Sequence, residues 1–327
     1  MRTRLRQTAA LLSLFTSLAA HADSDSDYDT MRAEARKDCV KAAPEYPAKD
    51  QAPPKDAHCS ATNAYYGIGE PVNDAKARAC AYAGDDHDVL AMLYANGRGV
   101  PRNIAVSRKA VCDDDDAAPA EIAGRLKHLA RMEAAPGGKP FDWCDDITSG
   151  LMEGSCAAIA STLKDQTRDQ GVATLAASWT APQKAALATL HREVEAFVKA
   201  RDGEVDLSGT ARAAMLIEAE DEVRTQFADL LARADAGRLA DVPPARAKAA
   251  DDALNAAWKK VRALPPLDLG TVKQPDLLVV QRAWLHYRDA WVAFGRQRYP
   301  AIARDTWIVT LTESRVKQLK ALSGDAN

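Results

Sequence analysis

Residues 279–300 read VVQRAWLHYRDAWVAFGRQRYP, and this stretch decides the fold class of the C-terminal half. Trp284, Tyr287 and Trp291 recur at intervals of three and four residues, which is helical spacing. An adjoining side of the same helix carries Gln281, Leu285, Arg288, Val292 and Gly295. We expect the aromatic residues to pack in a core rather than form an exposed docking surface, because aromatics in such helices usually face inward.

Helical spacing of apolar residues continues on both sides of this stretch. Long helices are expected over residues 147–165, 182–202, 207–235, 245–262, 276–298 and 301–322. Proline and glycine separate these segments, and no segment shows a sustained two-residue alternation. The sequence therefore predicts an all-α chain whose C-terminal part is a helical bundle.

Two copies of one turn pattern precede these helices. Gly67-x-Gly69-x-Pro71-x-Asn73-x-Ala75 returns as Gly97-x-Gly99-x-Pro101-x-Asn103-x-Ala105 at an offset of 30 residues. This period predicts stacked helix hairpins in a short solenoid. The glycines permit a tight turn, and the prolines are expected to begin the second helix of each hairpin. The first copy is shortened and has no clear leading helix.

The six cysteines all lie in the N-terminal half or at its border: Cys39, Cys59, Cys80, Cys112, Cys144 and Cys156. An even number with no C-x-x-C pair indicates a disulfide framework rather than a metal site. The pairing of the first four stays open. A Cys59–Cys80 bond would join the helices of the first repeat and leave Cys39 to pair with Cys112.

The first 22 residues have the pattern of a secretory signal peptide. Three arginines precede the apolar residues 9–20, and Ala20-His21-Ala22 places small residues at a cleavage site. No run of about 18 apolar residues follows. We expect cleavage after Ala22 and a periplasmic or secreted protein without a membrane span.

Charge is unevenly distributed along the chain. Residues 23–150 carry 16 Lys and Arg against 23 Asp and Glu, whereas residues 151–327 carry 24 against 23. This balance argues against nucleic-acid binding and favours a protein partner. The run Asp113–Asp116 is interpreted as a solvated loop, with a cation or a basic partner as the alternative. Catalytic, cofactor and metal-binding patterns are missing, so the protein is expected not to be an enzyme and to need no cofactor or metal.

Three C-terminal segments resemble the lysozyme inhibitor LprI-like family. They are an Asp-x-Leu-Asn helix with a following aromatic, a Gln-Arg-x-Trp-Leu-x-x-Arg-Asp-Ala helix and a Thr-x-x-Arg-x-x-x-Leu helix. The matching residues are Asp252, Leu254, Asn255, Trp258, Gln281, Arg282, Trp284, Leu285, Arg288, Asp289, Thr312, Arg315 and Leu319. The resemblance implies binding and inhibition of lysozyme, and an acidic mature surface would speed encounter with a basic lysozyme. Arg288 is expected to anchor a helix through a carboxylate or a helix C-terminus.

A second, degenerate copy of this unit is indicated upstream. Residues 183–197 echo residues 281–294, and Cys144 and Cys156 resemble the paired-cysteine opening of the same family. That resemblance implies a Cys144–Cys156 disulfide. The family's other cysteine pair is replaced by Val292 or its neighbour and by Trp307, where we expect apolar packing.

Residues 87–112 resemble the SEL-one-like repeat, which implies a protein-interaction role. The predicted organisation is a signal peptide at 1–22, a polar arm at 23–57, the repeat unit at 58–134, a boundary near 135–138, a degenerate LprI-like unit at 140–240 and an LprI-like domain at 245–322. Two functions follow: a lysozyme inhibitor or a periplasmic scaffold that uses its repeats and inhibits nothing. A cell-wall hydrolase is the least favoured alternative. The sequence indicates no oligomeric state.

Overall fold

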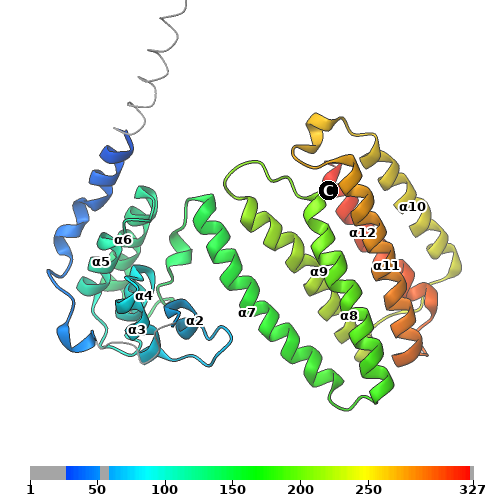
Figure 1. Ribbon diagram of the computed structural model, residues 1–327, viewed down its shortest axis with the longest axis horizontal. Helices are drawn as coiled ribbons and strands as arrows, with labels where there is room; N and C mark the ends of the chain where they lie inside the picture. The colour runs from blue at the N-terminus through cyan, green and yellow to red at the C-terminus, as the bar shows by residue number, and fades with distance from the viewer. Residues whose placement is uncertain (1–26, 52–58, 325–327) are drawn as a thin grey trace, which may run out of the picture. The chain divides into compact units, whose positions relative to one another are not determined.

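The computed structural model describes residues 27–51 and 59–324. All regular elements within these ranges are helices, so the all-α prediction is confirmed (Figure 1). The chain divides into two compact units, Met1–Ser149 (unit 1) and Gly150–Asn327 (unit 2). The expected signal peptide and parts of the polar arm lie outside the described residues.

Unit 1 is built on two helix hairpins. Helix α2 (Ala61–Tyr66) packs on α3 (Asp74–Ala83), and α4 (His87–Asn96) packs on α5 (Ile104–Asp113). Helix α3 also contacts α4, and α6 (Pro119–Ala134) covers α5. The first copy of the turn pattern therefore does have a leading helix, although α2 is only six residues long.

The two hairpins share their turn chemistry. Helices α2 and α4 end at Gly67 and Gly97, which both have a left-handed backbone that glycine adopts without steric cost. The side chain of Asn73 accepts a hydrogen bond of 3.0 Å from a backbone N–H at the start of α3. Asn103 caps α5 in the same way, at 3.2 Å.

These asparagine caps correct one expectation. The second helix of each hairpin begins immediately after the asparagine, and Pro71 and Pro101 lie ahead of the cap rather than in the first turn. The side-chain oxygen of an asparagine accepts a hydrogen bond from one of the unpaired N–H groups at the start of a helix. Asparagine is therefore a favoured N-cap residue.

Two disulfides hold the N-terminal segment and the first hairpin. Cys59 is bonded to Cys80 in α3, and Cys39 in η1 (Arg36–Lys41) is bonded to Cys112 in α5. Cys144 and Cys156 are also disulfide-bonded, and none of the described cysteines is free. Of the pairings that the sequence left open, the structure therefore has Cys59 with Cys80 and Cys39 with Cys112.

Unit 1 extends beyond the boundary expected near residues 135–138. Phe141 is 1% exposed, and its backbone exchanges hydrogen bonds of 2.7 and 2.8 Å with the side chain of Asn96 in α4. The buried Glu121 of α6 accepts hydrogen bonds of 2.9 Å from the backbone of Thr148 and Ser149. These contacts draw the segment after α6 into the first core, so the division falls after Ser149.

Unit 2 consists, over its described residues, of six long helices joined by short connections. They are α7 (Gly150–Ala176), α8 (Ala181–Arg201), α9 (Arg212–Asp235), α10 (Pro244–Arg262), α11 (Gln274–Arg298) and α12 (Arg304–Leu322). All six were expected, although α7 continues eleven residues beyond its predicted end and α9 begins later. The short helix η4 (Asp202–Glu204) follows α8, and η5 (Pro266–Leu269) precedes α11.

The helices of unit 2 pack in the same order in its two halves (Figure 1). Helix α7 packs mainly on α9, and α10 mainly on α12, while α8 and α11 pack against each other between the halves. Two tandem three-helix units related by duplication would give this order. The proposed duplication of residues 183–197 in residues 281–294 stays a prediction.

Three tryptophans form the centre of the C-terminal core. Trp284, Trp291 and Trp307 are each at most 1% exposed, and the rings of Trp291 and Trp307 stack with centroids 5.4 Å apart. A Cβ atom at Gly295 would lie 2.5 Å from the Trp307 indole nitrogen, so a glycine is needed there. The expected core packing, including apolar packing at Trp307, is confirmed.

Candidate binding sites

The residues of the LprI-like motif separate into a buried and an exposed group. The buried group is Leu254, Trp284, Thr312, Arg315 and Leu319. The exposed group is Asp252, Asn255, Arg282, Leu285 and Asp289, and Trp258, Gln281 and Arg288 are intermediate. The motif therefore marks the core of α10–α12 together with scattered surface positions, and it outlines no single binding face.

Arg315 is the most completely buried charged member of the motif. Its guanidinium forms a two-armed ion pair with Glu204 of η4, through Nη1 to Oε2 at 2.8 Å and through Nη2 to Oε1. Its Nε donates to Oε1 of Gln281 in α11 at 3.0 Å. Both side chains of the ion pair are 0% exposed. This pairing joins α12, α11 and the end of α8 in one polar network.

The network continues toward α9. Arg201 binds Glu204 and also reaches Glu222 at 3.1 Å, and Gln318 donates to the same glutamate at 3.1 Å. Burial alone would raise the pKa of Glu204, but the charges and hydrogen bonds of Arg315 and Arg201 outweigh it and hold that pKa below its ordinary value. Arg315 therefore neutralises an inward carboxylate and is not available to a partner.

Arg288 binds a carboxylate, one of the two kinds of anchor expected for it, and this carboxylate lies on its own helix. Its guanidinium pairs at 2.9 Å with the carboxylate of its neighbour Asp289 and lies 5.3 Å from the centre of the Trp284 ring. Both partners belong to α11, so Arg288 makes a local ion pair and a ring contact within one helix.

Unit 2 has opposite charge in its two halves. Residues 150–243, which form α7–α9, carry 10 Lys and Arg against 15 Asp and Glu. Residues 244–322, which form α10–α12, carry 14 against 7. The near-neutral total of this part of the chain therefore conceals an acidic half and a basic half. A basic partner is attracted to α7–α9 and repelled by α10–α12.

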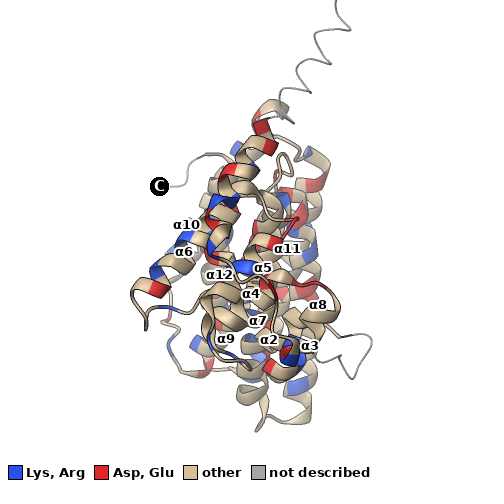
Figure 2. Cartoon of the chain, turned by 90° about the vertical axis from the view of Figure 1, so that its left-hand side faces the viewer, with Lys and Arg blue, Asp and Glu red and all other residues tan. Residues whose placement is uncertain are grey.

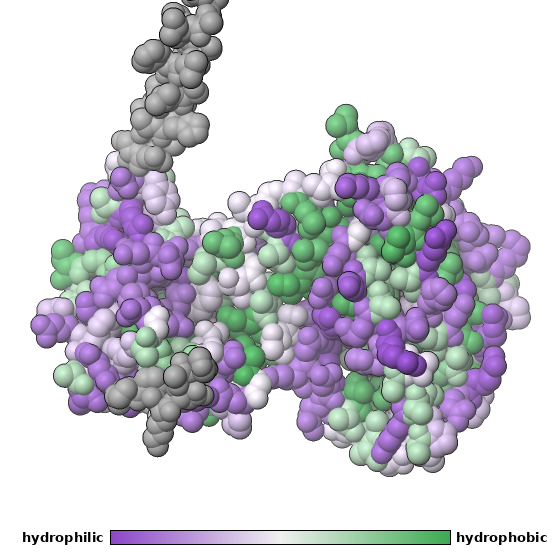
Figure 3. Space-filling model, in the orientation of Figure 1, coloured by the Kyte–Doolittle hydropathy of each residue, from purple (hydrophilic) through white to green (hydrophobic). Residues whose placement is uncertain are grey.

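A cavity of about 260 Å³ opens between α7, α8 and α9. Val194 and Phe227 are buried at its base, and the half-buried Val172 lies beside them. Its charged residues include Asp165, Asp169, Glu195, Arg168 and Arg224, and His191 meets the Phe227 ring edge-on. Figure 3 shows hydrophobic and hydrophilic surface interspersed over unit 2.

A second, shallower groove of about 560 Å³ runs between α7 and α9. Arg168 lines both this groove and the cavity. Its guanidinium donates to Asp221 at 2.8 Å and to Thr225 at 2.9 Å, which fixes it between the two helices. The two hollows are thus separated by a fixed cation that already has protein partners.

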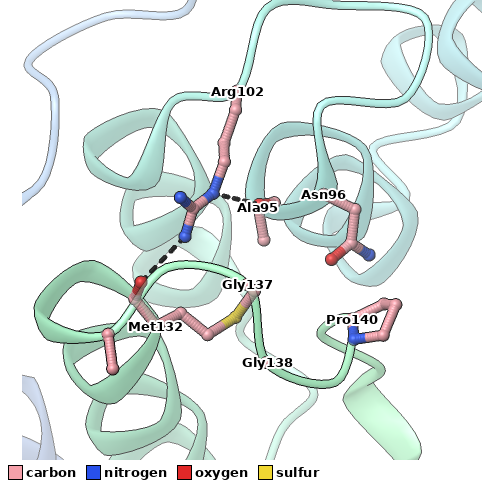
Figure 4. A pocket seen from close by; sticks show the side chains of 8 residues that line it. Ala95, Asn96, Arg102, Met132, Gly137, Gly138 and Pro140 are labelled. Atoms are coloured by element: carbon pink, nitrogen blue, oxygen red, sulfur yellow. Dashed lines mark hydrogen bonds between the residues drawn. The ribbon is translucent and has the colours of Figure 1, made fainter.

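Unit 1 has a cavity of about 200 Å³ beside the second repeat turn. Arg102 crosses it and donates to the carbonyl oxygens of Ala95 and Met132, at 3.0 and 2.9 Å (Figure 4). The amide of Asn96 at the other side is used by Phe141. These bonds brace the turn against α6 and leave few polar groups for a ligand.

The acidic run Asp113–Asp116 is not the solvated loop that was expected. Asp114 is 7% exposed and binds Arg125 of α6 at 2.8 Å. The exposed Asp115 pairs with Arg32 and Arg36 at 3.0 and 2.9 Å, which ties down the N-terminal segment. Figure 2 shows that acidic and basic residues are interspersed along the helices of the chain. The aspartates of this run bind arginines that are distant in sequence. The pattern of residues within the run gives no sign of these partners.

Arg125 also binds Asp88 of α4, at 2.9 Å. Burial raises the pKa of Asp88 to about 7; the charge of Arg125 opposes this rise, and the negative charge of the nearby Asp114 adds to it. This cluster of one arginine and two aspartates lies inside the repeat unit. The raised pKa of Asp88 means that this carboxyl takes up a proton at higher pH than an exposed aspartate does.

Sequence reasoning missed the cavity between α7, α8 and α9 as well as the partner of Arg315. The available signal was the helical spacing of Asp165, Arg168, Asp169 and Val172, which places them near one face of α7. In the described ranges, no group of three or more His, Cys, Asp or Glu is arranged to hold a metal ion. None of the helices searched there is long and apolar enough to cross a membrane.

These features define a two-unit, all-helical protein stapled by disulfides. A family model described as "Lysozyme inhibitor LprI" matches residues 232–319, which span the end of α9 and nearly all of α10–α12. The C-terminal resemblance is thereby supported at the level of the family model. No curated protein and no solved structure matches the chain.

Proposed function

We propose that this chain is an exported, non-enzymatic binding protein that inhibits a lysozyme. The observation that carries the proposal is the match of residues 232–319 to the LprI family model. The disulfide-bonded cysteines fit an oxidising compartment outside the cytoplasm, where lysozymes act. Inhibition would be steric, by covering the cleft of the enzyme.

The charge distribution favours one side of unit 2 for such a complex. Long-range attraction of a basic lysozyme acts on unit 1 and on α7–α9, where acidic residues are in excess. The matched segment would then provide the other half of the bundle, against which α8 packs.

The test is lysozyme activity on cell walls in the presence of purified, oxidised residues 23–327. The assay is run at low and at physiological salt, because charge attraction alone weakens as salt screens it. Inhibition that persists at physiological salt is the expected result. Inhibition only at low salt, or none at all, would reject the proposal.

A protein-interaction scaffold is the second candidate, favoured by the paired hairpins of unit 1. These hairpins repeat the same turn and cap, as stacked interaction repeats do. A chain that captures one envelope protein stoichiometrically yet leaves lysozyme fully active would favour this candidate.

A further inference from the structure

All residues that line the cavity between α7, α8 and α9 lie outside the segment matched by the family model. Its volume of about 260 Å³ is below the ~300 Å³ at which small-molecule sites usually begin. It is therefore better suited to a single side chain of a partner than to a free ligand of drug size.

The cations that line the cavity are already neutralised by protein carboxylates. Arg224 pairs with Glu195 at 3.1 Å and with Glu220 at 3.0 Å. Arg168 pairs with Asp165 and, at 2.8 Å, with Asp221.

The remaining charge at the cavity is acidic. Asp169 is exposed at the rim and forms no ion pair with a described residue. Burial would lower the pKa of Arg224, but its hydrogen bonds to Glu195 and Glu220 and the surrounding carboxylates raise it instead. The lining carries the carboxylates of Asp165, Asp169 and Glu195 against the guanidinium groups of Arg168 and Arg224, and this acidic excess favours an additional positive charge.

The base of the cavity is apolar and includes an aromatic ring. Phe227 is 5% exposed and Val194 is 1% exposed, and Val172 contributes further apolar surface. Lysine and arginine combine an aliphatic stem with a charged head, so the stem can contact this base while the head reaches a carboxylate. An aromatic ring adds attraction for a nearby cation.

We propose that this cavity receives a lysine or arginine side chain of a basic protein partner, with Asp169 binding the cationic head. The identity of that partner as a lysozyme rests on the proposed function, whereas the chemical class of the bound side chain does not. The cavity then adds a specific contact to the general attraction of the acidic half.

The first experiment probes the cavity without any protein partner. Nα-acetyl-arginine amide is titrated into residues 23–327, and methyl NMR shifts of Val172 and Val194 report binding. We expect saturable shifts that weaken about tenfold in Asp169→Asn and change less than twofold in Glu218→Gln. Glu218 is an exposed carboxylate on α9 that does not line the cavity, so its variant is a matched charge control. Absence of saturable shifts, or equal binding of uncharged Nα-acetyl-glutamine amide, would overturn the proposal.

The second experiment measures the dissociation constant for lysozyme at physiological salt. Asp169→Asn is expected to weaken binding about tenfold, and Val172→Phe, which fills the cavity without changing charge, should do the same. Circular dichroism confirms that each variant is folded. Undiminished lysozyme binding by both variants would refute the cavity as the contact site. If the protein binds the arginine probe but does not bind lysozyme, the proposed function is rejected and the assignment of the cavity stands.

Discussion

Arg315 and Glu204 form a fully buried, two-armed ion pair across 111 residues of sequence. One partner belongs to α12 and the other to the short helix that follows α8, so the pair ties the two halves of unit 2 together. Gln281 of α11 supports the arginine from a third side. The charged residue most deeply buried in the LprI-like motif thus links helices inside the bundle.

Replacing Arg315 by Met should destabilise unit 2 strongly. The substitution leaves the Glu204 carboxylate buried with less compensation, which typically costs about 3–5 kcal/mol. Adding Glu204→Met should recover part of that loss, because an apolar pair no longer buries an unmatched charge. Urea unfolding followed by tryptophan fluorescence measures both variants. Equal stabilities of the single and double variants would contradict this coupling.

Glu204 should also make unit 2 sensitive to acid. Its pKa is lowered in the folded state, so the stabilisation it contributes is present above the unfolded value of about 4.3 and is lost as pH falls through the folded pKa. Hydrogen exchange of α12 compared at pH 5 and pH 3 measures the loss. Glu204→Gln, although less stable overall, should show a smaller difference between the two pH values, and an unchanged difference would exclude this origin.

Unit 1 should respond to pH in the opposite sense around Asp88. Its folded pKa is about 7 and its unfolded pKa is about 3.9, so the folded state binds the extra proton between these values. The contribution of Asp88 to stability therefore declines as pH rises from about 4 to 7. Hydrogen exchange of α4 across this range is the measurement. The decline should disappear in Asp88→Asn, and its persistence in that variant would assign it to another group.

Gly69 and Gly99 occupy equivalent positions in the two repeat turns and provide a matched comparison. Both have positive φ, 70° and 64°, so alanine strains the backbone by about 1–2 kcal/mol at either site. A Cβ at Gly99 would also lie 2.9 Å from the Asp74 Cβ and 3.2 Å from its carbonyl carbon, whereas Gly69 has open space. Gly99→Ala should therefore lower the melting temperature of unit 1 more than Gly69→Ala. An equal fall in melting temperature for the two variants would show that the second turn shifts to accommodate the added methyl group.

Local pattern was sufficient for much of this architecture. Apolar spacing located the six long helices of unit 2, because an amphipathic helix must turn one face to a core wherever that core lies. The repeated Gly-x-Gly-x-Pro-x-Asn pattern located both hairpins, because positive φ and helix capping are properties of a few adjacent residues. The buried tryptophans of α11 and α12 were foreseeable for the same reason.

The partners of charged side chains were not foreseeable. The residues next to Arg315 in the sequence do not indicate that its ion-pair partner is Glu204. Likewise, the run Asp113–Asp116 does not indicate that its partners are Arg125, Arg32 and Arg36. The cavity with Asp169 at its rim likewise needs three helices brought together. The sequence by itself determined the helices, the turns, the cysteine-rich half and the apolar faces, because each depends on neighbours along the chain. Only the tertiary structure decided which charged side chains neutralise one another and that Asp169 forms no ion pair with a described residue. Coulomb energy depends on distance in space and on burial, and both are set when remote segments of the chain pack together.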